Sequence, residues 1–180
     1  GDVYIFKNVT FLDENNFLDE VVKNNIDNII NKSILSNENY STDKINELNE
    51  KISDYIYAFL DKNSISNFSV VGHSMGSLIA LEMASSQPER VNAISMIGTA
   101  FPMQVNDALL DSAKNNSQIA IDILTFMGYS YASRLGGNKN PGIWMTELTK
   151  RLMQKSSKGV IYKDLKACAD FKYGLEKANK

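Results

Sequence analysis

The sequence has 180 residues, 43% of them hydrophobic, which fits one soluble domain with a substantial core. A net charge of −2 gives no field that would attract nucleic acid or an anionic membrane surface, and the single cysteine, Cys168, excludes an internal disulfide. No apolar run is as long as a bilayer-spanning helix and no signal-peptide pattern is present, so we expect a cytoplasmic protein.

Three segments precede the central part of the chain. Residues 3–6 are β-branched and aromatic, which predicts a short strand. Apolar residues then recur at three- and four-residue steps, which predicts an amphipathic helix over residues 13–30. A second amphipathic helix is predicted over residues 42–62, and its charged face is expected to be solvated surface.

A strand, a helix and another strand are predicted next, over residues 68–71, 77–85 and 91–97. The helix is apolar nearly all round, so we expect it to be buried between a sheet and another layer, and Pro88 to end it. Both strands lack polar alternation, which is typical of parallel strands covered on both faces. Together the three segments predict one βαβ unit.

The first of these strands leads into a Gly-x-Ser-x-Gly pattern that begins at Gly72. Between a strand and an apolar helix, this pattern predicts a nucleophile elbow, a sharp turn that holds a serine in a strained conformation. Gly72 and Gly76 flank the turn because a Cβ atom there would collide with neighbouring backbone. Ser74 is therefore the candidate catalytic nucleophile, and the N–H of Met75 is the candidate donor to an oxyanion.

Helical patterns dominate the rest of the chain. They cover residues 105–115, 117–129, 144–155 and 162–177, with a glycine- and asparagine-rich break over residues 136–142. The sequence thus predicts a helical region after the last strand.

The stretch from Phe68 to Ile97 resembles the strand–elbow–helix–strand unit of α/β-hydrolase-fold proteins. The likeness is carried by Val-Val-Gly-His-Ser-Met-Gly-Ser and, after the helix, by Gln-Pro-Glu-Arg-Val, with Ser77 standing where many members have a second glycine. The resemblance implies a partial α/β-hydrolase fold, with a short parallel sheet in residues 1–102 and a helical cap or lid in residues 103–180. It also implies a serine hydrolase that acts on a small-molecule ester or related acyl substrate.

A cap of this kind would cover a substrate pocket. Phe101, Met127, Trp144 and Met145 are candidates to line an acyl or aromatic pocket beneath it. Ordinary packing between helices is the simpler interpretation of each of these side chains taken singly.

A serine hydroxyl becomes a nucleophile only when a base, normally a histidine oriented by a carboxylate, takes its proton. The one histidine, His73, directly precedes Ser74, and neighbouring side chains on a sharp turn diverge, so we expect His73 to support the elbow. Asp107 and Asp111 are weak candidates for the acid, because they lie inside a helical pattern. In the family, acid and histidine follow later strands, so the resemblance implies a chain truncated before both; a start at Gly1 instead of methionine also suggests a processed or excised piece.

Two functions stay open from the sequence. One is a serine hydrolase that uses Ser74 and Met75; the other is a catalytically silent fragment, or a binding or assembly module, that retains the elbow. No cofactor or metal is expected, because the sequence has neither a glycine-rich phosphate loop nor clustered ligands. We expect no nucleic-acid or membrane partner, and self-association through open sheet edges.

Overall fold

The structure is a computed structural model that describes residues 4–6, 9–11, 48–137 and 144–180. The helix predicted over residues 13–30, and the first residues of the helix predicted from residue 42, lie outside the described residues. The chain forms two compact units, one of Gly1–Gln104 with Ala167–Lys180 and the other of Val105–Lys166. The assignment of residues 103–180 to a cap stays a prediction.

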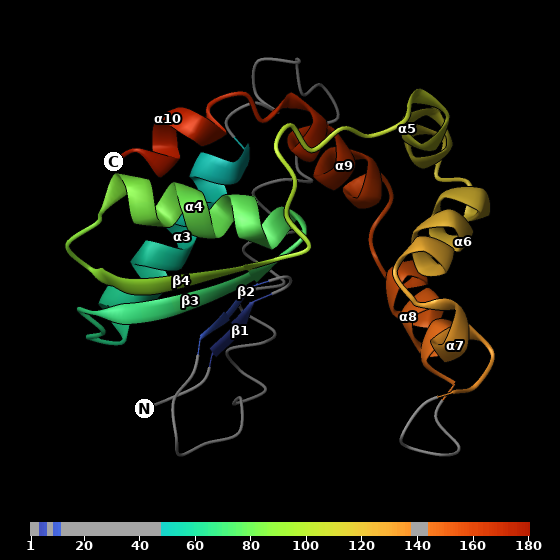
Figure 1. Cartoon of the computed structure of the whole chain (residues 1–180), viewed down its shortest axis with the longest axis horizontal. Coiled ribbons are helices and arrows are strands. Elements are labelled where there is room, and N and C mark those ends of the chain that lie inside the picture. Colours follow the sequence, from blue (N-terminus) through green and yellow to red (C-terminus); the bar gives the residue numbers. More distant parts are fainter. Residues whose placement is uncertain (1–3, 7–8, 12–47, 138–143) are drawn as a thin grey trace. The chain divides into compact units, whose positions relative to one another are not determined.

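A four-stranded sheet in the order β1-β2-β3-β4 supports the first unit (Figure 1). β3 (Phe68–His73) and β4 (Val91–Ile97) run parallel and finish at the same end of the sheet. β1 (Tyr4–Phe6) and β2 (Val9–Phe11) pair antiparallel with each other, and β2 pairs antiparallel with β3. The sequence pattern predicts β1 and the parallel pair but not β2, which has only three residues.

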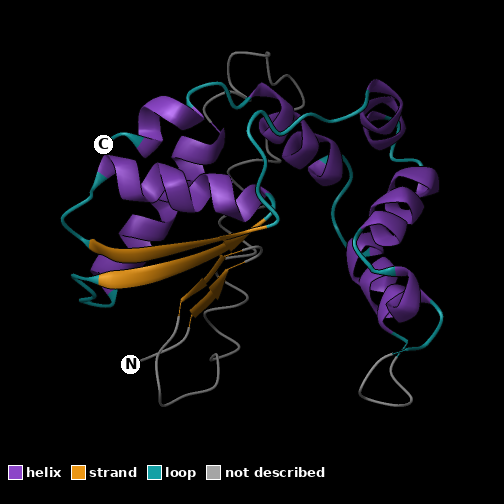
Figure 2. Ribbon diagram, in the orientation of Figure 1, coloured by secondary structure: helices purple, strands orange, loops and turns teal. Residues whose placement is uncertain are grey.

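The helix α4 (Met75–Ser86) connects β3 to β4 and packs against both of them (Figure 2). Its large side chains are fully buried, with Leu78 at 1% and Met83 at 0% exposure. α3 (Leu48–Lys62) packs on α4 and buries Leu60 completely. The prediction of an apolar helix buried between the sheet and another layer is therefore confirmed.

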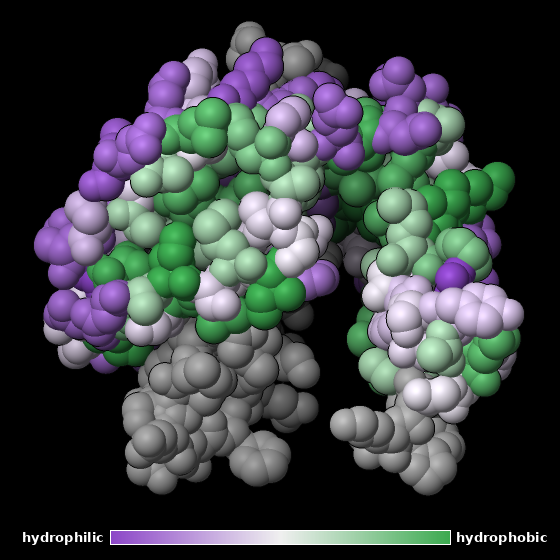
Figure 3. Space-filling view, viewed as in Figure 1, coloured by the Kyte–Doolittle hydropathy of each residue, from purple (hydrophilic) through white to green (hydrophobic). Residues whose placement is uncertain are grey.

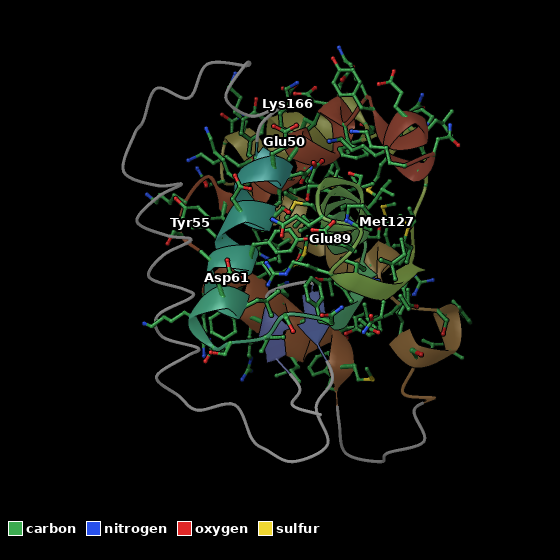
Figure 4. All side chains as sticks on the ribbon, turned by 90° about the vertical axis from the view of Figure 1, so that its left-hand side faces the viewer. Glu50, Tyr55, Asp61, Glu89, Met127 and Lys166 are labelled. Carbon is green, nitrogen blue, oxygen red and sulfur yellow. The ribbon has the colours of Figure 1, made fainter. Side chains whose placement is uncertain are left out.

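Tyr57 ties α3 to its neighbours. Its hydroxyl donates a hydrogen bond of 2.8 Å to the carbonyl of Met83, and its ring meets Phe68 of β3 edge-on, with 5.9 Å between the centroids. Burial raises the pKa of the Tyr57 phenol above its ordinary value of 10.0. Figure 4 shows the same helix with Glu50 and Asp61 near its two ends and Tyr55 directed outward.

β4 corrects one expectation from the sequence. Both β3 and β4 are expected to be covered on both faces, but β3 alternates between buried and exposed residues, and most residues of β4 are exposed, including Ile94 at 37% and Ile97 at 50%. The physical reason is that, among the described elements, α4 alone packs extensively on β4 besides its partner strand β3, and β4 is the last strand in the order. Self-association through this edge stays a prediction.

Arg90 fixes the end of the sheet where β3 and β4 begin. Its guanidinium donates hydrogen bonds to the carbonyls of Ile65 (2.8 Å) and Ser66 (3.0 Å), and it pairs with Asp61 at 2.8 Å. The same group lies 5.0 Å from the centroid of the Tyr57 ring. One side chain thus joins the end of α3, the loop before β3 and the start of β4.

The C-terminal residues differ from the sequence pattern, which predicts one helix over residues 162–177. The structure has two helices there, α9 (Val160–Asp170) and α10 (Gly174–Ala178). At the start of α10, Gly174 lies so close to the ring of Phe101 that a Cβ atom would sit 2.5 Å from it, a tertiary contact made just after the break. Local periodicity carries no information on that contact.

An ion pair holds α10 within the first unit. The Lys177 ammonium lies 2.6 Å from a carboxylate oxygen of Glu82 on α4, and 3.7 Å from Glu50 on α3. Glu82 is only 5% exposed. A buried carboxylate needs such a partner, because an unpaired charge in an apolar surrounding is strongly unfavourable.

The second unit is helical. It contains α5 (Asp107–Lys114), α6 (Gln118–Met127), α7 (Tyr131–Arg134), α8 (Met145–Gln154) and the first part of α9. Its buried cluster is small and consists of Leu109, Ala113 and Ala120. The pattern predicts α5, α6 and α8, whereas α7 is too short to show a period. In the described ranges, none of the helices has both the length and the apolar character to cross a bilayer.

Candidate active site at the end of β3

Ser74 occupies the turn between β3 and α4 and has an unusual backbone conformation. Its φ is 54° and its ψ is −123°, a combination that L-amino acids rarely adopt. The residue is solvent-exposed. Serine at a helix N-cap usually accepts a hydrogen bond from the helix amides, but the Ser74 side chain makes no such bond to α4 within the described structure. Its hydroxyl is therefore not engaged in capping.

Backbone contacts on both sides hold this strained residue in place. The N–H of Ser74 donates to the carbonyl of Ile97 at the end of β4, at 2.9 Å. The carbonyl of Ser74 accepts from the N–H of Ser77 at 2.9 Å and from the Ser77 hydroxyl at 2.5 Å. Ser77 is completely buried. Backbone strain persists only where surrounding contacts over-determine it, and here the sheet and the first turn of α4 supply those contacts.

The role of Ser77 is not foreseen from the sequence, which shows only a serine in place of a glycine. A signal is nevertheless present, since a hydroxyl three residues after the elbow serine is within reach of its carbonyl. The structure places the Ser77 hydroxyl on that carbonyl.

Gly72 makes the turn sterically possible. A Cβ atom on Gly72 would lie 2.1 Å from the carbonyl oxygen of Gly76 and 2.7 Å from the Cα atom of Ser77. Both atoms belong to the backbone of α4, so they have no rotamer through which to move away. The expected close approach of backbone at Gly72 is therefore confirmed.

Met75 begins α4, and its side chain is buried, with 6% of the residue exposed. The first amides of a helix have no intrahelical partner and point outward from its N-terminus, where the helix dipole favours negative charge. The N–H of Met75 is thus one of the amides at the helix start that lack an intrahelical partner. Its use as an oxyanion donor stays a prediction.

His73 is exposed at the end of β3, opposite Ile97 of β4. Its Nε2 atom lies next to Gly98, where a Cβ atom would be 3.5 Å away. The imidazole therefore lies toward the end of β4, beside the backbone that Ser74 also contacts. The role of His73 as a support for the elbow stays a prediction.

The remaining candidates lie away from this turn along the chain. Asp107 is the first residue of α5 and Asp111 lies within α5, so both belong to the second unit, as the helical pattern predicts. Phe101 belongs to the first unit and packs edge-on against Phe171, with 6.2 Å between the centroids. Met127, Trp144 and Met145 belong to the second unit and are exposed. A pocket formed by these four apolar side chains stays a prediction.

Within the described ranges, no group of three or more His, Cys, Asp or Glu side chains is placed to hold a metal ion. The groups that the structure describes at the elbow are the Ser74 hydroxyl and the first amides of α4.

A family model described as the alpha/beta hydrolase fold matches residues 33–136. That match spans more than half of the 180 residues, so the chain belongs to the α/β hydrolase fold family. No curated protein and no solved structure gives a significant match. The fold class expected from the resemblance, a partial α/β-hydrolase fold, is thereby confirmed.

Proposed function

We propose that this chain is the nucleophile-bearing part of a serine hydrolase that acts on a small ester or related acyl substrate, with Ser74 as nucleophile. The observation that carries the proposal is the backbone of Ser74, at φ 54° and ψ −123° on an exposed turn between a strand and a buried helix. A strained serine without a capping bond is costly to maintain, and such strain concentrates at functional sites.

In the proposed reaction, the Ser74 oxygen attacks the substrate carbonyl carbon while a base takes the hydroxyl proton. The carbonyl oxygen becomes an oxyanion, which the N–H of Met75 stabilises. Collapse of this intermediate expels the leaving alcohol with a proton returned from the base, and water then releases the acyl group from Ser74 by the same steps.

In this proposal, His73 is not the base that takes the proton from Ser74. His73 directs its ring toward Gly98 and is expected to act on the elbow rather than on the reacting proton. We therefore assign the base and its acid to groups outside the described residues. Without them, an elbow serine with an oxyanion donor retains an acceleration on the order of a thousandfold over water.

A second function, a catalytically silent binding or assembly module, is favoured by the single histidine of the sequence. In such a protein the elbow would have a structural role only, and Ser74 would not be reactive. The two proposals differ in the reactivity of one hydroxyl, which a phosphonylating probe measures directly.

The test is labelling with a fluorophosphonate probe, followed by mass spectrometry of the modified peptide. We expect slow but specific labelling of Ser74, and none in Ser74→Ala. Ser69→Ala, which changes another exposed serine on β3, is the matched control and should label like the original chain. Labelling spread over several serines, or absent under conditions that leave the fold intact, would contradict the proposal and favour the silent module.

His73→Ala separates the two possible roles of the imidazole. If His73 only supports the elbow, the substitution should leave the small rate of p-nitrophenyl acetate hydrolysis within about threefold, because no proton transfer is lost. A hundredfold loss would identify His73 as the base, since general-base catalysis contributes about 10²- to 10⁴-fold.

A further inference from the structure

The helix α8 presents its polar side to its neighbours and its apolar side outward. Three polar contacts join it to α6 and to the turn after α6: Thr149 with Tyr129 (2.5 Å), Lys150 with Asp122 (2.7 Å), and Gln154 with Gln118 (2.9 Å). The hydrogen bond from Lys150 lowers the pKa of the Asp122 carboxyl, so this pair stays ionised at neutral pH. In a soluble protein the opposite arrangement is usual, with the apolar stripe of a helix turned toward the core.

Four apolar side chains form what we call the outer face of α8. They recur at helical spacing and are exposed: Trp144 at 69%, Met145 at 37%, Leu148 at 54% and Leu152 at 59%. Figure 3 shows hydrophobic residues at the surface of this unit beside hydrophilic ones. Single exposed apolar residues need no explanation, but a contiguous set marks a site of interaction.

The charge of the second unit differs from that of the whole chain. Residues 105–166 contain nine Lys and Arg against five Asp and Glu, a net charge of +4, while the full sequence has a net charge of −2. The remaining residues therefore carry −6. At the edge of the outer face of α8, Lys155 has no ion pair within the described structure, and Arg151 pairs only with Glu147 of its own helix. The chain average thus hides a basic helical unit.

Size and charge restrict what could cover the outer face of α8. The helix has ten residues and is about 15 Å long. A stable protein complex buries about 800 Å² on each partner, far more than one face of such a helix offers. A second copy docked through the same face would bring two units of +4 together, which repel each other.

We propose that the outer face of α8 binds the surface of an anionic lipid bilayer, with the helix lying in the interface. Leucine, methionine and tryptophan side chains beside lysine and arginine are the composition of helices that lie in a membrane interface. Trp144, at the start of α8, has the ring type that accumulates at the level of the lipid headgroups. This binding is peripheral, it does not require Ser74, and it revises the expectation of no membrane partner, which used the charge of the whole chain.

The experiment uses the full 180-residue chain and two kinds of vesicle, phosphatidylcholine alone and an equal mixture of phosphatidylcholine with phosphatidylglycerol. Trp144 is the only tryptophan, so its emission reports on the proposed face without a label. We expect the emission to shift to shorter wavelength and the chain to float with the anionic vesicles. Binding to phosphatidylcholine alone should be at least tenfold weaker, and added salt should weaken binding to the mixture.

Variants locate the binding to α8. Leu148→Gln with Leu152→Gln should weaken binding to anionic vesicles at least tenfold. Leu175→Gln is the matched control, because Leu175 is 67% exposed on α10 and lies outside the proposed face. Arg151→Gln with Lys155→Gln should weaken binding to the mixture about fivefold or more, and Ser74→Ala should not change it.

Four results would overturn the proposal. They are no binding to the anionic vesicles, equal binding to both kinds of vesicle, equal loss in Leu175→Gln and the α8 variant, and binding without a shift in the Trp144 emission. Circular dichroism shows whether each variant keeps its helices; because all the substituted side chains are exposed, we expect no loss of structure.

Discussion

The two units of this chain use apolar side chains in opposite ways. In the first unit, large side chains such as Leu60, Leu78 and Met83 are completely or almost completely buried around α4. In the second unit, two of the three buried cluster members are alanines, while Phe126 and Leu152 are exposed. The difference teaches that the strained Ser74 lies in the unit with the larger buried side chains, where tightly packed neighbours leave the backbone no alternative.

Among the substitutions considered for the elbow, replacement of Gly72 should cause the largest loss of stability. In Gly72→Ala, the new Cβ would lie 2.1 Å from a backbone oxygen of α4. The helix or the strand must move, and we expect the free energy of unfolding to fall by about 3 kcal/mol or more. Thermal unfolding followed by circular dichroism measures this loss.

Gly136→Ala in the second unit is the control for Gly72→Ala. Gly136 has a φ of 84°, and among the described residues no atom lies within 4 Å of its Cβ position, so it tests strain without collision. We expect a cost of about 1 kcal/mol. Equal losses in the two variants would mean that the clash at Gly72 is relieved by a small movement of α4.

Truncation of leucines should sharpen the contrast in packing. Leu78→Ala creates a cavity between α4 and its neighbours and should cost about 3 kcal/mol. Leu152→Ala removes a side chain that is 59% exposed and should change stability by less than about 0.5 kcal/mol. Chemical denaturation of both variants measures the two changes in unfolding free energy. A large loss of stability in Leu152→Ala would show that other parts of the same chain cover the outer face of α8.

Tyr57→Phe should have a smaller effect that depends on pH. The carbonyl of Met83 keeps the Ser86 hydroxyl as a donor, at 3.1 Å, so loss of the phenol should cost about 1 kcal/mol near pH 7. Burial raises the pKa of the folded Tyr57, so the unfolded chain ionises first, and stability falls as pH rises above 10.0.

Because phenylalanine does not ionise, Tyr57→Phe should lose less stability than the original chain between pH 7 and about pH 11. Urea unfolding at the two pH values measures the difference. Tyr55→Phe, on an exposed position of the same helix, is the control and should change the unfolding free energy by less than about 0.5 kcal/mol at pH 7. An alkaline loss as steep in Tyr57→Phe as in the original chain would contradict the assignment.

The smallest effect is expected at Ser74 itself. Ser74→Ala keeps the backbone contacts to Ile97 and Ser77 and removes a hydroxyl that does not cap α4. Stability should be unchanged or slightly higher, as is common when a residue kept for chemistry is replaced. A fall of several degrees in melting temperature would mean that the serine has a structural role, and the proposed nucleophile would lose its main support.

The sequence predicts the first unit's centre better than its edges. The strand predicted over residues 91–97 coincides with β4, and the helix predicted over residues 77–85 lies within α4, because unbroken apolar runs and Pro88 set their limits. The burial of β4 is not predicted correctly. An apolar strand has the same sequence pattern in the middle of a sheet and at its edge. The segments that pack on it, and so decide its exposure, lie elsewhere in the chain.

The site shows the same limit. The Gly-x-Ser-x-Gly pattern places Ser74 on a turn between a strand and a helix, which the structure confirms with a positive φ. The hydrogen bond from the Ser74 N–H to the Ile97 carbonyl joins two segments that are apart in the sequence. It depends on the register of β3 against β4, which the local pattern does not give. The outward apolar side of α8 is likewise invisible to periodicity, which finds a stripe but does not say which way it faces.

The cluster around Arg90 has a consequence for hydrogen exchange. Arg90 closes the start of β3 through Ile65 and Ser66, while the bond from Ser74 to Ile97 closes its end. A strand closed at both ends cannot fray, so the amides of Val70 and Gly72 should exchange with deuterium only when the whole unit opens, whereas those of α8 should exchange through local opening. Arg90→Gln should make exchange begin at Phe68 and proceed toward the elbow, so the order in which amides are lost would show that the strand is released from one end.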